Sequence, residues 1–146
     1  MSNTIKIYLA GQMSNLTYDQ MNSWRVELKH MLLKSAEMSG VKIKVINPVD
    51  YYNFQNPRHK TEREVMDYDL NHVKSSDIVI VNLYGLNDSR GTGHEIYEAF
   101  RSGIPVLAFG NIYEYKNVHP WDKECITRVD WTKEELIEYI TDFYFT

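Results

Sequence analysis

Two carboxylates, Asp88 and Glu95, stand close together in the segment 82–95, which is polar and rich in glycine. Gly91 and Gly93 lie between them, and glycine lets a backbone approach a ligand closely because it has no side chain. Carboxyl groups in such a place can serve as acid, base or nucleophile. They also occur as ordinary turn and helix-start residues. Both interpretations stay open on this segment alone.

We expect a helix to start in the loop formed by Gly91, Thr92 and Gly93, which puts Glu95 in its first turn. The positive end of the helix dipole would keep that carboxylate ionised and lower its pKa. Arg90, beside the same helix start, is suited to bind an anion such as a phosphate, or to lie in solvent or pair with Asp88. A Walker phosphate loop is excluded because no Gly-Lys-Ser/Thr follows the glycines.

The sequence predicts no metal site and no cofactor. The chain has five histidines, but none is spaced from another like a pair of metal ligands. Cys125 is the single cysteine, so it can form neither an internal disulfide nor a cysteine-based zinc site.

Four apolar runs of strand length, at 5–10, 41–46, 78–81 and 105–109, alternate with helical patterns. Capping boxes predict helix starts at Thr17 and Thr61, and the last helix is expected to start at Thr132. Gly40 is expected to end the first helix in a left-handed conformation. A weak extra strand is expected at 126–129, and the stretches 47–60 and 110–130 show no clear period.

This order predicts an α/β fold: a small doubly wound parallel sheet of four to five strands, flavodoxin- or Rossmann-like, flanked by helices in one domain over 1–146. Ligands of such sheets bind outside the carboxyl ends of the strands. We therefore expect substrate-binding residues in the segments that follow the first and third strands, namely Gly11, Gln12, Asn82, Asp88, Gly91 and Thr92.

Several of these residues carry a resemblance to a known family. Tyr8 on the first strand, Asp69 on the helix before the third strand, Asp88 after that strand, then Gly91-Thr92 and Glu95-Ile96 follow the order seen in nucleoside 2-deoxyribosyltransferases. The resemblance covers roughly residues 5–109. It departs at Arg90, which makes the spacing from Asp88 to Glu95 seven positions where the family usually has six.

The resemblance implies transfer of a 2-deoxyribosyl group between nucleobases through a covalent deoxyribosyl-glutamate. Glu95 corresponds to the nucleophile, and Tyr8 to the tyrosine that hydrogen-bonds it. Asp69 and Asp88 are candidates for the acid that protonates the leaving base. Two alternatives stay open: an N-glycosidase on the same scaffold that hydrolyses a (deoxy)nucleoside or its 5′-monophosphate, and a non-catalytic nucleotide-binding protein.

The overall composition limits the kinds of partner. The 146 residues include 16 Lys and Arg and 20 Asp and Glu, giving a net charge of −4 that argues against binding to a nucleic acid polymer. No apolar run approaches a membrane span, so we expect a cytoplasmic protein acting on small nucleosides and nucleobases. Aromatic residues in the two long loops suit either base stacking or a homo-oligomer interface: Tyr51, Tyr52, Phe54, Tyr113, Tyr115 and Trp121.

Overall fold

The computed structural model describes residues 3–52 and 54–146 of the chain. Its elements are, in order, β1 (Ile5–Ala10), α1 (Tyr18–Ser39), β2 (Ile43–Ile46), α2 (Pro48–Tyr51), α3 (Glu62–Lys74), β3 (Ile78–Asn82), the 3₁₀ turn η1 (Leu86–Asp88), α4 (Arg90–Arg101), β4 (Val106–Phe109), α5 (Ile112–Lys116), α6 (Pro120–Glu124), β5 (Arg128–Asp130) and α7 (Lys133–Phe143).

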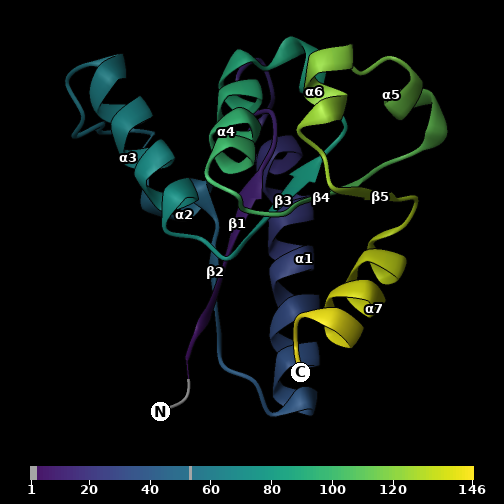
Figure 1. Cartoon of the computed structure of the whole chain (residues 1–146). Coiled ribbons are helices and arrows are strands. Elements are labelled where there is room, and N and C mark those ends of the chain that lie inside the picture. The colour runs from purple at the N-terminus through teal and green to yellow at the C-terminus, as the bar shows by residue number, and fades with distance from the viewer. Residues whose placement is uncertain (1–2, 53) are drawn as a thin grey trace.

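The five strands form one parallel sheet in the order β2-β1-β3-β4-β5, with helices on both faces (Figure 1). The predicted α/β fold is therefore confirmed. The chain leaves β1 toward β2 on one side and returns to β3 on the other, so the direction of winding changes between β1 and β3. This is the position at which open parallel sheets bind ligands.

Alternate residues of β1 face opposite layers, as the period of a strand requires. Ile7 and Leu9 pack with α1 and α7, whereas Tyr8 and Ala10 face the layer of α3 and α4. All four are fully buried. The alternation therefore points Tyr8 toward the helix that carries Glu95.

The predicted helix ends agree with the structure for α1, α3 and α7. Thr17 and Thr61 both form complete capping boxes, and Thr132 accepts a hydrogen bond from the Glu135 N–H. Gly40 closes α1 with φ of 70°.

The two stretches without clear period contain short elements rather than plain loops. Stretch 47–60 holds α2, and its position 53 lies outside the described residues. Stretch 110–130 holds α5, α6 and β5, and this last strand occupies Arg128–Asp130 rather than 126–129. Helices of four or five residues are too short to show a helical period in a sequence.

Candidate active site

A cavity of about 1310 Å³ opens at the carboxyl ends of β1 and β3. Its wall is formed by the segment that follows β1, by α1, α2 and α3, by the loop between α2 and α3, and by the first turns of α4. Typical ligand pockets measure roughly 300–1,000 Å³. The cavity is therefore large enough for a ligand of nucleotide size.

Glu95 and Tyr8 meet inside this layer of the fold. The Tyr8 hydroxyl donates a hydrogen bond to Glu95 Oε2. The pKa of Glu95 is raised to about 8, chiefly by burial; the nearby Asp69 carboxyl adds to the rise, and the Tyr8 hydrogen bond and the Arg25 charge oppose it. The pKa of Tyr8 is raised as well, mainly by burial, so its hydroxyl stays protonated and remains a donor.

The expected placement of Glu95 in the first helical turn is wrong. Ser89 is the N-cap of α4, and its hydroxyl accepts a hydrogen bond from the Thr92 N–H at 3.3 Å. The helix therefore begins at Arg90, and Glu95 lies in its second turn. Because the dipole effect fades within the first turn and burial dominates here, the pKa of Glu95 is raised rather than lowered.

Asp69 lies on the part of α3 that lines the same cavity. Two phenols donate to one of its oxygens: Tyr51 Oη lies 2.8 Å and Tyr52 Oη 2.6 Å from Asp69 Oδ1. Burial raises the pKa of Asp69, and the two hydrogen bonds act against that rise. Of the acidic residues that line the cavity, Asp69 and Glu95 thus each lie in an environment that favours the protonated form.

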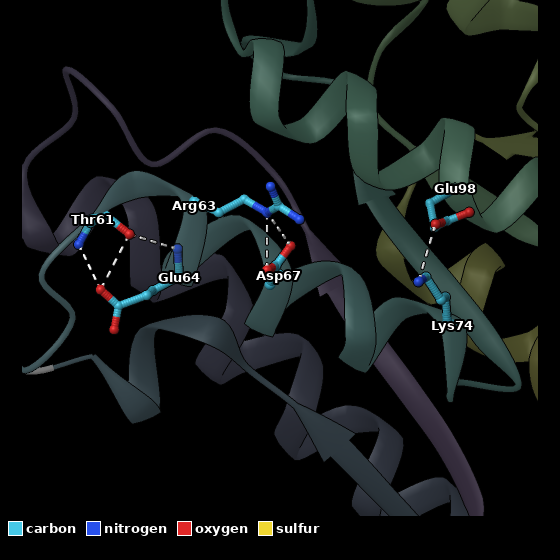
Figure 2. A network of polar contacts seen from close by, with 6 residues as sticks. All are labelled: Thr61, Arg63, Glu64, Asp67, Lys74 and Glu98. Carbon is cyan, nitrogen blue, oxygen red and sulfur yellow. Dashed lines mark hydrogen bonds and ion pairs between the residues drawn. The ribbon is translucent and has the colours of Figure 1, made fainter.

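Short-range polar contacts fix α3 at both ends (Figure 2). At the first turn, Glu64 Oε1 accepts from the Thr61 N–H at 2.8 Å, and Thr61 Oγ1 accepts from the Glu64 N–H at 3.2 Å. At the last turn, Lys74 Nζ lies 3.7 Å from Glu98 Oε1 on α4. The helix that carries Asp69 is thereby tied to the helix that carries Glu95.

Arg25 is a buried cation that sequence reasoning missed. It is 1% exposed, and its guanidinium donates to Gly11 O at 2.9 Å, to Leu9 O at 3.4 Å and to Met21 O. These contacts hold the carboxyl end of β1 against α1, and Arg25 also lines the cavity. A signal was present, because Arg25 stands four positions after Met21 and three before Leu28, on the apolar face of its helix.

The six predicted substrate-binding residues fall into two groups. Those that line the cavity are Gly11, Asp88, Gly91 and Thr92. Gln12 and Asn82 are not among the lining residues. Gln12 Nε2 donates to Ser14 O at 3.1 Å, and Asn82 Oδ1 accepts from the Tyr84 N–H at 3.0 Å, so both side chains organise the loops in which they lie. At Gly11 an added Cβ would lie 2.6 Å from Trp24 Cζ2, which explains the glycine.

The aromatic residues of the stretches 47–60 and 110–130 also fall into two groups, those that line the cavity and those that do not. Tyr51, Tyr52 and Phe54 line the cavity. Tyr115 instead packs against Trp131 with ring centroids 6.0 Å apart, while Tyr113 and Trp121 are exposed. Arg90 and His94 line the cavity beside Glu95. Among residues 3–52 and 54–146, no three His, Cys, Asp or Glu side chains gather in a way that could hold a metal ion.

The fold and site define a class of protein: a small Rossmann-like α/β protein whose switch-point cavity holds paired carboxyl groups. The sequence profile of nucleoside 2-deoxyribosyltransferases matches residues 7–127, and the chain belongs to that family. A comparison with curated proteins found no match. Within the described part of the chain, no helix is both long and apolar enough to cross a membrane.

Solved structures with the same fold share little sequence with this chain. A conserved protein from Enterococcus faecalis is 18% identical, with a TM-score of 0.75 and coverage of 96% of this chain and 99% of that one. A 2-deoxyribosyltransferase from Bacillus psychrosaccharolyticus is 20% identical, with a TM-score of 0.58 and coverage of 92% and 91%. A CMP N-glycosidase from Clostridium botulinum is 17% identical, with a TM-score of 0.57 and coverage of 95% and 98%.

Proposed function

We propose that this protein transfers a 2-deoxyribosyl group from one nucleobase to another, with Glu95 as the nucleophile. The observation that carries the proposal is the Tyr8 hydrogen bond to Glu95 in the cavity that also contains Asp69. Two carboxyl groups flanking a glycosidic bond can divide the work of nucleophile and acid, as in retaining glycosidases.

In the first half of the reaction, a Glu95 oxygen bonds to C1′ of the bound deoxynucleoside as the bond from C1′ to the base nitrogen breaks. The electron pair of the broken bond goes to the base, and Asp69 supplies the proton that the leaving base needs. Glu95 becomes a neutral ester and Asp69 a carboxylate. The transition state resembles an oxocarbenium ion, which the Glu95 carboxylate stabilises.

In the second half, a ring nitrogen of the acceptor base attacks C1′, and the ester bond breaks with its electron pair returning to Glu95. The acceptor base gives its proton to Asp69, which restores the starting state. The reactive form has one proton on the pair, held by Asp69. Burial raises the pKa of Glu95, and the Tyr8 hydrogen bond and the Arg25 charge act against that rise by favouring the ionised form that the reaction needs.

Intact-protein mass spectrometry tests the proposal. Incubation with a 2′-deoxynucleoside should add the mass of one deoxyribosyl group to the wild-type protein and nothing to Glu95→Ala. Addition of a second free base should then yield the exchanged nucleoside. Full exchange activity in Glu95→Ala would contradict the assignment, and absence of any turnover in the wild type would favour a nucleotide-binding protein.

Hydrolysis of a nucleoside 5′-monophosphate is a second candidate, favoured by the position of Arg90. This exposed arginine lines the cavity at the first residue of α4, where its charge and the helix dipole can act together on a phosphate. Turnover of a deoxynucleoside should be compared with that of its 5′-monophosphate. A preference for the monophosphate that Arg90→Ala removes favours the hydrolase, whereas a preference for the free nucleoside that survives this change favours the transferase.

A further inference from the structure

Asp69 has one occupied oxygen and one that receives no hydrogen bond from either neighbouring tyrosine. Tyr51 and Tyr52 are adjacent in the chain and both donate to Oδ1, at 2.8 Å and 2.6 Å. A carboxyl oxygen has two lone pairs, so two phenol donors fill the acceptor capacity of Oδ1. A proton taken up by Asp69 therefore resides on Oδ2.

We propose that Tyr51 and Tyr52 are positioning residues that make Asp69 a directional acid, with its transferable proton carried on Oδ2 and delivered from that oxygen to the leaving base. The inference rests on the proposed function for its proton-transfer step. As the glycosidic bond breaks, Oδ2 gives its proton to the base, and the resulting carboxylate keeps both phenol hydrogen bonds on Oδ1.

The two tyrosines are themselves held in place by the fold. They lie at the end of α2, whose N-cap is Asn47: Asn47 Oδ1 accepts from the Val49 N–H at 3.0 Å, and Asn47 Nδ2 donates to Asn22 Oδ1 at 2.9 Å. The rings of Tyr51 and Tyr52 pack edge to face with centroids 4.7 Å apart. The two hydroxyl groups therefore reach Asp69 from a helical turn that is capped by Asn47 and bonded to α1 through Asn22.

The His72 ring packs against the Tyr51 ring. The two rings stack with centroids 5.3 Å apart, and His72 Nδ1 lies 3.2 Å from Lys6 Nζ. Burial and the Lys6 charge lower the pKa of His72, which favours a neutral ring whose Nδ1 accepts a hydrogen bond from the Lys6 ammonium. A neutral His72 can pack against the Tyr51 ring without adding a positive charge near the Asp69 carboxyl group.

Other titratable and charged groups interact electrostatically with Asp69, and they come from several elements. Beyond the two tyrosines they are His59 from the loop before α3, His72 on α3, Tyr8 on β1, Arg25 on α1 and Glu95 on α4. Substitution of either tyrosine by phenylalanine leaves all of these in place. The change then isolates one hydrogen bond to Oδ1.

The experiment compares Tyr51→Phe and Tyr52→Phe with Tyr68→Phe as the matched control. Tyr68 belongs to the same aromatic cluster and contacts Tyr51 and His72 through its ring. The pKa of Asp69 is followed in the full chain by carboxyl ¹³C NMR, with the resonance assigned by its loss in Asp69→Asn. Because a hydrogen bond to a carboxylate favours the charged form, each of the first two variants should raise the Asp69 pKa by about one unit. Tyr68→Phe should leave it unchanged.

The same variants give a kinetic readout. Formation of the deoxyribosyl-Glu95 adduct needs both protonated Asp69 and ionised Glu95, so one edge of its pH–rate profile follows the Asp69 pKa and the other follows the Glu95 pKa. In Tyr51→Phe and Tyr52→Phe the edge set by Asp69 should move to higher pH by the shift seen in the NMR titration, and the other edge should stay in place. An Asp69 pKa that does not move, or that moves equally in Tyr68→Phe, overturns the positioning role. If the Asp69 pKa shifts but the pH–rate profile of adduct formation does not, the proposed delivery of a proton from Asp69 to the leaving base is wrong. A wild type that forms no adduct refutes the proposed function, while the NMR titration still decides the positioning.

Discussion

Among single residues, Glu95 has surroundings that disfavour its own charge. The carboxyl is buried in the layer of α4, near a second carboxyl, and its pKa is about 8. An unfolded chain leaves a glutamate pKa at about 4.3. The folded protein therefore binds the Glu95 proton more tightly than the unfolded chain does.

This difference predicts how the stability of a Glu95→Gln variant depends on pH. Since the folded pKa is the higher one, the stabilising contribution of Glu95 is complete below about pH 4.3 and is lost as the pH rises toward about 8. Glutamine carries no charge at any pH, so the free energy of unfolding of Glu95→Gln relative to that of the wild type should increase by about 4 kcal/mol between pH 5 and pH 9. Urea denaturation at both pH values measures this.

Glu138→Gln provides the control, because Glu138 is an exposed residue on α7. It should show no gain at pH 9 relative to pH 5. A Glu95→Gln variant whose advantage is the same at both pH values would contradict the raised pKa.

The residues of the site were predictable to different degrees. Tyr8, Asp69 and Glu95 could be selected by their order along the chain, and the structure does bring them to one region. The raised pKa of Glu95 could not be predicted, because burial is set by packing between α4 and β1 rather than by neighbours in sequence. The bonds from Tyr51 and Tyr52 to Asp69 span 18 and 17 positions, and no local pattern announces them.

Among the elements, the junction between α1 and β1 depends on Arg25. Its guanidinium satisfies carbonyls of Leu9 and Gly11 where β1 ends, and it lies 4.5 Å from the centroid of the Trp24 ring. Arg25→Met should therefore leave buried carbonyls without partners and lower the free energy of unfolding by about 3 kcal/mol. Chemical denaturation of the two proteins measures the loss.

Arg25→Lys refines this test. A lysine keeps the charge but lacks the planar fork that reaches two carbonyls, so it should recover only part of the lost stability. A loss below about 0.5 kcal/mol in Arg25→Met would show that the buried cation does not hold the junction.

The start of α3 depends on its capping box. Thr61→Ala removes the acceptor for the Glu64 N–H and should cost about 1 kcal/mol of local helix stability. The expected result is faster amide hydrogen exchange at 62–66, with little change in β3. Thr17→Ala removes the same cap from α1, whose Leu28 and Leu32 lie in the core, and it should lower global stability instead. Equal exchange at 62–66 in Thr61→Ala and wild type would contradict the role of the cap.

Sequence patterns predicted the long helices and the central strands because each has both a period and end signals. Thr17, Thr61 and Thr132 each stand three positions before a Glu or Gln. The predicted start of α4 was wrong because its N-cap, Ser89, has Thr92 rather than a Glu or Gln three positions later. Two glycines also lie in the first turn. Glycines predict a loop, yet here Gly91 and Gly93 belong to the helix. Packing of Ile96 and Ala99 into the core compensates for the low helix propensity of the two glycines.

For the whole molecule, exposed aromatic side chains are the basis of a prediction about self-association. Tyr97 and Phe100 on α4 and Trp121 on α6 border a groove of about 670 Å³, and Trp121 is 81% exposed. Large exposed apolar groups that cluster are typical of interfaces between subunits. We expect a homo-oligomer in solution, and light scattering should give a mass above the 17.2 kDa of one chain.

Trp121→Asp should weaken that association without unfolding the protein, because this side chain is exposed in the folded chain. Phe143→Asp, at a comparably exposed position on α7, is the matched control and should leave the mass unchanged. A wild-type mass of one chain at micromolar concentration would refute self-association.

The region matched by the family ends at residue 127, before β5 and α7. Yet Leu136 and Ile140 of α7 are fully buried against the same cluster as Leu28 and Leu32 of α1. A chain shortened to the matched region would expose that face of α1 and leave β4 as a bare sheet edge prone to aggregation. Since α1 also supplies Arg25 to the wall of the cavity, the last helix supports the cavity from the opposite face of the sheet.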